Sequence, residues 1–143
     1  MQIFESSSPL ETQKIAEELA KDLKAGDILT LDGDLGAGKT VFSKGIAKGL
    51  GIAKEVTSPT FIIMQSYEGG RLPLYHFDVY RLEDSDELLE TGAEDYLFGN
   101  GVSIIEWAEI IEDILPDNVI RVNITRDPEK GDDYRKITIE KNS

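Results

Sequence analysis

Residues 27–50 read DILTLDGDLGAGKTVFSKGIAKGL, and this stretch decides the expected fold. Its first part, residues 27–32, is a short apolar run of the kind that forms a buried strand. Residues 33–40 match the pattern G-x-x-x-x-G-K-[ST] at every fixed position. The apolar side chains that follow recur at helical spacing as far as Gly51. A strand, a glycine-rich loop and a helix in this order predict a phosphate-binding loop.

The loop supplies the groups that a magnesium nucleotide needs. Gly36 and Gly38 let successive backbone N–H groups converge on phosphate oxygens, and the helix that begins near Lys39 aims its positive end at them. Lys39 would reach the β- and γ-phosphates, and the Thr40 hydroxyl would bind Mg²⁺. We therefore expect ATP or ADP with Mg²⁺ as the bound cofactor. The loop residues expected to contact the nucleotide are Asp34, Leu35, Gly36, Ala37, Gly38, Lys39 and Thr40.

Such a site also needs a carboxylate at the end of a second strand. Glu106 follows the apolar strand expected at residues 102–105, and we expect it to hold the metal and to be catalytic. Asp78 follows another strand and is a second candidate, for the metal or for orienting the attacking water. Because the carboxyl ends of parallel strands meet at one edge of a sheet, both acids are expected near Thr40. Either acid could instead be a surface carboxylate at a strand end.

Three further features near these residues have alternative interpretations. His76 is the single histidine, and between two aromatic residues in a strand it is expected to be a hydrogen-bonded packing residue rather than a catalyst. Trp107 is expected either in the core or facing a partner. Residues 57–60, Thr-Ser-Pro-Thr, would either sense the γ-phosphate or form a plain turn.

The remaining pattern completes an α/β domain. Ser8, Pro9 and Glu11 form a helix start, with a capping hydroxyl, a proline in the first turn and a glutamate that can close a capping box. We expect one phosphate-loop ATPase domain over residues 1–143. Its sheet should be mixed and mostly parallel, flanked by helices, with a C-terminal antiparallel hairpin at its edge. The other expected elements are helices over 9–24, 84–92, around Tyr96 and from Trp107 to Pro116, and strands over 61–67, 72–77, 119–125 and 134–140.

The composition indicates which kinds of partner and which cellular location to expect. The chain of 143 residues has a formal net charge of −13 and no cysteine, which excludes disulfides and thiolate metal sites. No Lys or Arg lies between Arg81 and Arg121, and residues 83–95 are rich in Asp and Glu. This acidic block would repel a phosphate backbone, so it is either a solvated helix face or a docking surface for a basic partner. Without a membrane-length apolar run or a leader-like start, the expected location is the cytoplasm, with no membrane contact.

Four segments together resemble one known family. They are GDLGAGKT at 33–40, SPTF at 58–61, YHFDVYRL at 75–82 and IEW at 105–107, in this order and spacing. Through them the chain is similar to the bacterial tRNA threonylcarbamoyladenosine biosynthesis ATPase family, also called TsaE. The resemblance runs from Thr12 to about residue 126, and the C-terminal hairpin carries the least of it.

The resemblance implies a small ATPase that supports threonylcarbamoyl transfer to adenosine in tRNA as part of a multiprotein complex. It implies that Lys39 binds phosphates, that Thr40 and Glu106 hold Mg²⁺, that Asp78 is catalytic, and that Thr12 lies near the adenine. The implied partners are the threonylcarbamoyl transferase and its pseudo-enzyme companion, that is, TsaD-like and TsaB-like proteins. Contact with this machinery is expected through protein, without direct tRNA binding.

The residues by themselves are also compatible with two other functions. A small-molecule kinase uses the same loop, although the arginines of this chain are scattered rather than gathered over an acceptor. A nucleotide-gated binding module, in which hydrolysis is incidental, also fits. A GTPase is not favoured, because the chain has no Asn-Lys-x-Asp segment. Arg81 is the nearest arginine-finger candidate by pattern, and a finger supplied by a partner is worth roughly 10³ to 10⁵ in rate. Slow hydrolysis by the isolated chain is therefore expected.

Overall fold

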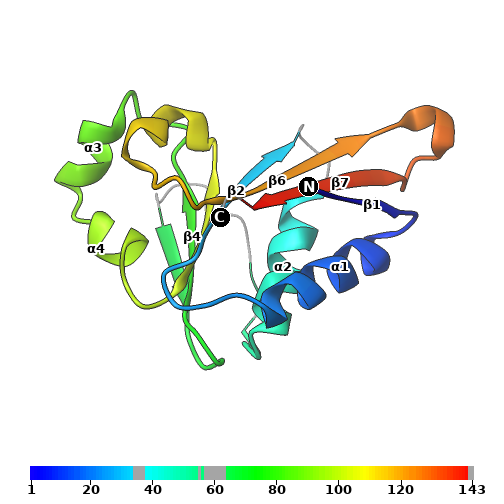
Figure 1. The fold of residues 1–143 in the computed structure, drawn as a ribbon, viewed down its shortest axis with the longest axis horizontal. Coiled ribbons are helices and arrows are strands. Elements are labelled where there is room, and N and C mark those ends of the chain that lie inside the picture. Colours follow the sequence, from blue (N-terminus) through cyan, green and yellow to red (C-terminus); the bar gives the residue numbers. More distant parts are fainter. Residues whose placement is uncertain (34–37, 55, 57–63, 142–143) are drawn as a thin grey trace.

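The computed structural model describes residues 1–33, 38–54, 56 and 64–141. These residues form a seven-stranded sheet flanked by helices on both faces (Figure 1). The strand order across the sheet is β1-β7-β6-β2-β5-β4-β3. The strands are β1 (Gln2–Ser6), β2 (Ile28–Gly33), β3 (Met64–Tyr67), β4 (Leu74–Asp78), β5 (Val102–Glu106), β6 (Ile120–Arg126) and β7 (Arg135–Lys141).

The middle of the sheet is parallel. β2 pairs in parallel with β5 on one side and with β6 on the other, and β4 pairs in parallel with β5. The outer pairs, β3 with β4, β6 with β7 and β1 with β7, are antiparallel. The carboxyl ends of the four parallel strands therefore lie along one edge, where ligands bind in open α/β sheets.

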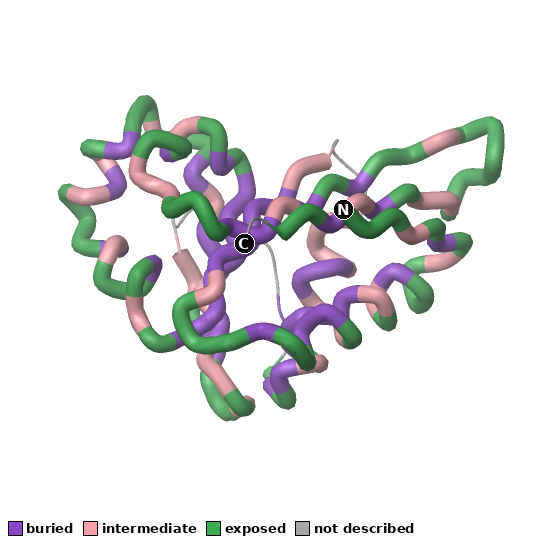
Figure 2. Tube along the Cα trace, in the orientation of Figure 1, coloured by how far each residue is buried: buried purple, intermediate pink, exposed green. Residues whose placement is uncertain are grey.

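Two sets of helices cover the two faces of the sheet, and the central strands between them are buried, while the outer strand β1 is largely exposed (Figure 2). Helices α1 (Pro9–Lys21) and α2 (Lys39–Gly49) share one apolar core with β2, β6 and β7. On the other face, α3 (Ser85–Glu90), α4 (Glu94–Leu97) and the 3₁₀ segment η1 (Ala108–Ile114) enclose a second core around Phe77 and Ile105. A short turn of 3₁₀ helix, η2 (Pro128–Lys130), joins β6 to β7.

Two glycines set how closely α2 approaches α1. A Cβ atom at Gly45 would lie 2.4 Å from the Gln13 carbonyl oxygen, and one at Gly49 would lie 2.5 Å from the Ala20 Cβ. Both distances are too short for real contacts, so only glycine permits this packing. The close contact fixes α2, and with it the end of the glycine-rich loop.

Backbone groups at both ends of α1 form hydrogen bonds with side chains. At the N-terminus the partner is the one that the sequence predicts, and at the C-terminus it is a residue distant in sequence. The Ser8 hydroxyl accepts a hydrogen bond from the Glu11 backbone N–H at 3.1 Å, as an N-cap does. Beyond the other end, the Arg71 guanidinium donates to the carbonyl oxygens of Ala20 and Leu23 at 2.8 and 3.0 Å. Arg71 therefore ties the β3–β4 turn to the end of α1.

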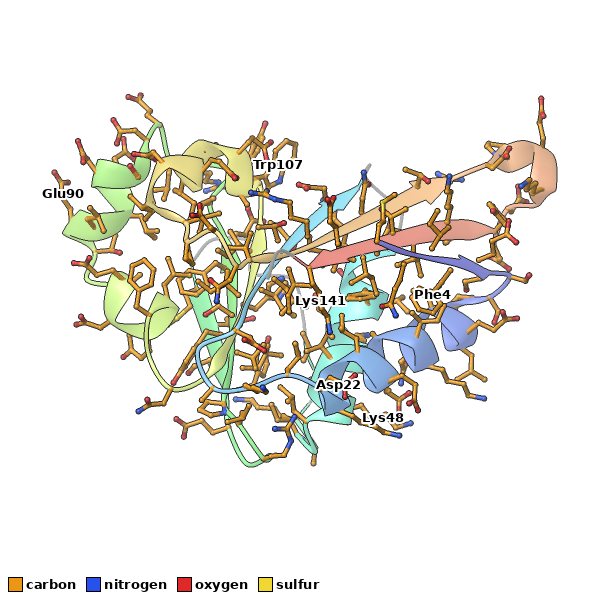
Figure 3. All side chains as sticks on the ribbon, viewed as in Figure 1. Phe4, Asp22, Lys48, Glu90, Trp107 and Lys141 are labelled. Atoms are coloured by element: carbon orange, nitrogen blue, oxygen red, sulfur yellow. The ribbon has the colours of Figure 1, made fainter. Side chains whose placement is uncertain are left out.

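The predicted fold class and the antiparallel C-terminal hairpin of β6 and β7 are confirmed, but the prediction that this hairpin lies at the edge of the sheet is wrong. β7 pairs with β1 on its outer side, so the edge strand is β1, which the sequence patterns do not predict. The reason is that β1 lacks a clear alternation of apolar and polar residues. Its Ile3 is 55% exposed, while the next residue, Phe4, points toward α1 and packs against the core (Figure 3).

Two helix predictions also need correction. The first helix ends at Lys21 rather than at Lys24. The helix expected after Trp107 is a 3₁₀ segment with non-helical backbone angles at Ile111. Among the described residues, no helix combines the length and the apolar character that a membrane crossing requires.

Candidate functional site

The end of the glycine-rich loop is built for a sharp turn into α2. Gly38 has φ of 101°, a left-handed conformation that favours glycine, and it caps the helix whose first residue is Lys39. Thr40 follows in the first turn of α2 and is half-buried. The predicted contacts at Asp34, Leu35, Gly36 and Ala37, and the segment 57–61, lie outside the described residues.

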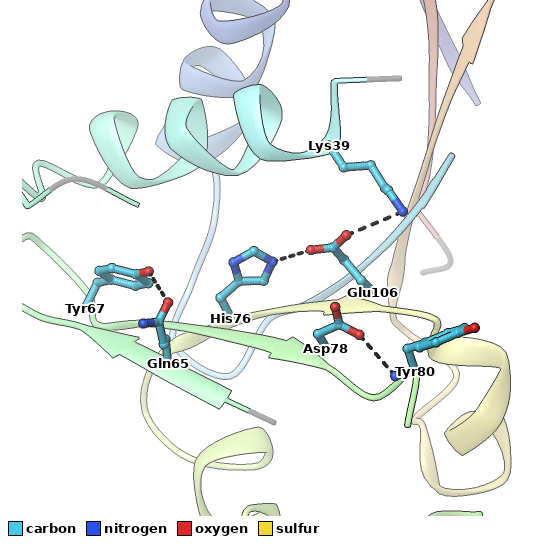
Figure 4. Close-up of polar contacts among 7 residues, drawn as sticks. All are labelled: Lys39, Gln65, Tyr67, His76, Asp78, Tyr80 and Glu106. Carbon is cyan, nitrogen blue, oxygen red and sulfur yellow. Dashed lines mark hydrogen bonds and ion pairs between the residues drawn. The ribbon is translucent and has the colours of Figure 1, made fainter. Parts of the chain in front are cut away.

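Lys39 and Glu106 lie opposite each other across the edge of the sheet. Glu106 is the last residue of β5, and its Oε1 atom is 3.4 Å from Lys39 Nζ (Figure 4). Both side chains are largely buried, at 15% and 8% exposure. The structure therefore brings together the predicted phosphate-binding lysine and the predicted metal-binding acid.

His76 completes a three-residue network that the sequence analysis missed. Its Nε2 atom lies 2.7 Å from Glu106 Oε2, within hydrogen-bonding distance, and its side chain is fully buried (Figure 4). The parallel register pairs Asp78 with Glu106, and His76 precedes Asp78 by two residues on the same strand. Alternation along β4 therefore places His76 on the same face of the sheet as Glu106. The sequence shows this alternation, but the register that brings His76 to Glu106 is known only from the structure.

The network keeps Glu106 ionised despite its burial. Burial acts to raise the pKa of the Glu106 carboxyl group, but the hydrogen bond with His76 and the charges of His76 and Lys39 outweigh it. The pKa of Glu106 therefore lies below its ordinary value. An ionised carboxylate at this position is the form that binds a metal ion.

Asp78 lies beside Glu106 at the end of the neighbouring strand β4. Its Oδ1 atom accepts a hydrogen bond from the Tyr80 backbone N–H at 3.0 Å, which stabilises the turn that follows β4 (Figure 4). Asp78 is half-buried, so its carboxylate is accessible from the sheet edge. The predicted pair of acids is thus adjacent in the fold.

Thr12 lines a hollow of about 140 Å³ next to the loop end, together with Gly38 and Val41 of α2. Its hydroxyl group donates to the Ser6 hydroxyl at 2.7 Å, so this group links α1 to β1. Arg135 lines the same hollow, and its Nε atom lies 3.9 Å from where a Cβ on Gly38 would stand. The sequence analysis did not anticipate an arginine from β7 beside the loop.

A larger cavity of about 400 Å³ opens on the other side of Lys39. Asp32, at the end of β2, lines it, and burial together with the nearby Glu109 charge raises the pKa of Asp32. The charges of Arg121 and Lys39 oppose this rise only in part. The other lining residues are Leu31, Gly33, Lys39, Trp107, Glu109, Asn123, Ile124 and Thr125.

An aromatic pair covers the lysine. The Lys39 Nζ atom lies 5.5 Å from the centre of the Trp107 ring, close enough for a cation–π interaction. The Trp107 and Tyr80 rings contact each other with their centroids 4.8 Å apart, and Trp107 is 41% exposed. Trp107 also has φ of 64°, a conformation that is strained for a residue with a side chain. Trp107 is therefore a partly exposed cover over the site.

The donor chemistry at this edge fits Mg²⁺ bound together with a nucleotide. Thr40, Asp78 and Glu106 offer hydroxyl and carboxylate oxygens, the hard ligands that Mg²⁺ prefers. Within residues 1–33, 38–54, 56 and 64–141, no group of three or more Asp, Glu or His side chains forms a metal cage by itself. Such a site would need phosphate oxygens as further ligands, which is the usual arrangement for Mg²⁺ in phosphoryl-transfer proteins.

Known proteins are similar to this chain in sequence and in fold. A family model described as Threonylcarbamoyl adenosine biosynthesis protein TsaE matches residues 6–137. The tRNA threonylcarbamoyladenosine biosynthesis protein TsaE of Bacillus subtilis is 52% identical over 131 residues, which cover 92% of this chain and 80% of that protein. The protein of the same name from Treponema pallidum is 40% identical over 134 residues, covering 94% and 96%. A crystal structure of YdiB from Bacillus subtilis matches with a TM-score of 0.80 and 43% identity, over 99% of this chain and 86% of that one.

Proposed function

The chain belongs to the TsaE family of threonylcarbamoyl adenosine biosynthesis proteins, and we propose that it is a magnesium-dependent ATPase. In this proposal, ATP binding and hydrolysis support the transfer of a threonylcarbamoyl group to adenosine in tRNA. The relatives carry that biosynthetic role in their names. The nucleotide, the metal and the hydrolysis are our inference from the site.

The observation that carries the proposal is the pairing of Lys39 with Glu106. A lysine at the start of α2, directly after the left-handed Gly38, is placed to meet phosphate oxygens at the helix N-terminus. A carboxylate 3.4 Å away, at the end of a parallel strand, is placed to hold a metal beside the same phosphates. A glycine-rich turn with no ligand would not need this pair.

Each residue then has a role that its position supports. Lys39 would bind the β- and γ-phosphates, and the backbone at Gly38 would contribute N–H donors. Thr40 and Glu106 would hold Mg²⁺, which when bound neutralises charge on the phosphate oxygens. Asp78, beside Glu106, would orient the attacking water as a general base.

The base of the nucleotide would occupy the hollow next to Thr12. This hollow adjoins Gly38, so a nucleotide with its phosphates at the loop can extend into it. Because the Thr12 hydroxyl already donates to Ser6, its contact with adenine would come from the methyl group or from a lone pair of the hydroxyl oxygen. Arg135 lines the same hollow and would face the sugar or the phosphate nearest to it.

We propose protein partners rather than direct tRNA contact. The partners would be the threonylcarbamoyl transferase and its pseudo-enzyme companion, TsaD-like and TsaB-like proteins, in the cytoplasm. The acidic block at residues 83–95, whose acids are mostly exposed, supports contact through a basic protein surface and disfavours RNA. If a partner completes the site, hydrolysis by the isolated chain is slow.

Phosphate release measured with and without these partners tests the proposal. Glu106→Gln should lower the rate at least about tenfold, because the amide no longer holds the metal. Glu68→Gln, an exposed change in the turn between β3 and β4 and outside the acidic block, is the matched control and should leave the rate unchanged. Equal rates for the two variants would contradict the role of Glu106. Nucleotide binding with no turnover, even in the complex, would instead indicate a nucleotide-gated binding module.

A further inference from the structure

We propose that His76 is a positioning residue of the nucleotide site. Its hydrogen bond holds one oxygen of Glu106 in place when Lys39 moves from the other oxygen to the phosphates. This inference rests on the proposed function. It assigns a role in ligand binding to a residue that the sequence alone favours as a packing residue.

The geometry divides the Glu106 carboxylate between two partners. Oε2 faces His76 Nε2 at 2.7 Å, and Oε1 faces Lys39 Nζ at 3.4 Å. The contact with His76 is the shorter of the two, and His76 is fully buried within the sheet. The ammonium group of Lys39 lies at the end of a longer side chain, which projects from the first residue of α2. The two partners therefore differ in how firmly they are held.

Nucleotide binding would break one of these contacts. For Lys39 to bind the β- and γ-phosphates, its ammonium group has to turn away from Glu106 Oε1. A largely buried carboxylate that loses the lysine beside it is strongly destabilised, and it would follow the lysine or change rotamer. The hydrogen bond from His76 prevents this, because it stays in place on the other oxygen. Oε1 is then left free at the sheet edge for the metal.

The surroundings of His76 argue against a purely structural role. Among the described residues, Glu106 is the hydrogen-bond partner of this ring, and the buried Nδ1 atom has none. An apolar side chain would fill the same space without leaving a buried nitrogen unpaired. A histidine whose polar contact is the site carboxylate is better explained by what it does for that carboxylate. Second-shell partners of this kind orient metal ligands in many proteins.

Two variants and a control separate positioning from packing. His76→Leu removes the hydrogen bond, and His76→Gln places an amide N–H near the Nε2 position. Ser103→Ala, on the neighbouring strand β5, is the matched control, because its hydroxyl is buried without a hydrogen-bond partner among the described residues. Each protein is titrated with ADP in the absence of Mg²⁺, then with Mg²⁺ at saturating ATP. Binding is followed by the fluorescence of Trp107, the single tryptophan, and unfolding by thermal denaturation without nucleotide.

The affinities for Mg²⁺ and for metal-free ADP should change by different amounts. His76→Leu should weaken Mg²⁺ binding about 10–100-fold, while its affinity for metal-free ADP stays within about twofold of wild type. His76→Gln should recover most of the lost Mg²⁺ affinity, and Ser103→Ala should behave as wild type. This pattern cannot come from loss of stability alone, which would weaken both ligands together.

The results that overturn each proposal are distinct. A wild-type protein that binds neither ADP nor Mg-ATP contradicts the proposed function itself. A wild-type protein that binds both, with wild-type Mg²⁺ affinity in folded His76→Leu, contradicts the role of His76 alone. If His76→Leu does not fold, the smaller change His76→Ala, which also removes the hydrogen bond, is combined with Glu106→Gln. Independent effects of these two changes on Mg²⁺ affinity in the double variant contradict the inference, and a shared effect supports it.

Discussion

Lys39 Nζ lies 3.4 Å from Glu106 Oε1, so the lysine of the glycine-rich loop and the acid at the end of β5 form a largely buried ion pair. The pair links α2 to the parallel centre of the sheet. Its two members come from segments 67 residues apart in the numbering, 39 against 106, and the β2–β5 pairing brings them together. In the proposed ATPase, nucleotide binding exchanges this contact for one between Lys39 and phosphate.

Gly45→Ala should destabilise the protein by about 1–3 kcal/mol, although alanine favours a helix more than glycine does. The added Cβ would lie 2.4 Å from the Gln13 carbonyl oxygen and 2.6 Å from the Ala16 Cβ, which forces α1 away from α2. Urea denaturation measures the change. Lys48→Ala on the same helix is the control: its exposed side chain makes a long ion pair of 3.9 Å with Glu17 of α1, so the variant should stay within about 0.5 kcal/mol of wild type. A stabilised Gly45→Ala protein would refute the close packing of α1 and α2.

Asp32→Asn should stabilise the protein at neutral pH. Burial, with the Glu109 charge, raises the pKa of Asp32, so its charged form is less stable in the folded protein than in the unfolded chain. The stability that Asp32 contributes is therefore present below its ordinary pKa of 3.8 and is lost as pH rises through the folded-state pKa. Because Asp32 is only half-buried, we expect a gain of at most about 0.5 kcal/mol.

Thermal unfolding across pH measures this effect. The difference between Asp32→Asn and wild type should vanish at acid pH, where Asp32 is protonated in both folded and unfolded chains. Asp117→Asn, at an exposed position, is the control for removing one negative charge from an acidic protein. A gain for Asp32→Asn no larger than that for Asp117→Asn would contradict the raised pKa.

Arg71→Met should cost about 1 kcal/mol of stability, because the carbonyl oxygens of Ala20 and Leu23 lose a charged donor. The methionine keeps most of the apolar part of the side chain, so the measurement isolates the hydrogen bonds. Arg126→Met, at the exposed end of β6, is the control. Chemical denaturation showing equal stability for the two variants would mean that Arg71 does not cap α1.

Parts of this architecture could be predicted because their signals are local. The glycine-rich loop has a fixed spacing, and Ser8 with Glu11 marks the start of α1 within four residues. The strand β1 could not be predicted, because it is stabilised by pairing with β7, more than 120 residues away by number, as Gln2 with Ile139. Pairings of this kind depend on the tertiary fold rather than on a local pattern.

The acids of the candidate site were predictable, but their partner was not. Glu106 and Asp78 follow apolar strands, and the rule that parallel strands end at one edge places them together. His76 is one residue within an apolar run, and a lone histidine there is most often a packing residue. Its contact with Glu106 depends on the register of β4 against β5, which the sequence does not specify.

Bare tRNA should not bind the isolated chain tightly. The net charge of −13 and the exposed acids in residues 83–95 repel a phosphate backbone. Filter binding or fluorescence anisotropy at low and high salt measures this directly. Tight binding that weakens steeply with salt would contradict the proposed contact through protein partners.

The central claim is that the Lys39 end of the loop binds the phosphates of a magnesium nucleotide. Its most direct test is calorimetric titration of Mg-ATP into the wild-type protein, Lys39→Ala and Lys48→Ala. Both variants remove one positive charge from α2, but Lys48 is exposed near the far end of the helix (Figure 3). The account predicts that Lys39→Ala weakens binding at least about tenfold while Lys48→Ala matches wild type. Wild-type affinity in Lys39→Ala, or an equal loss in both variants, would contradict it.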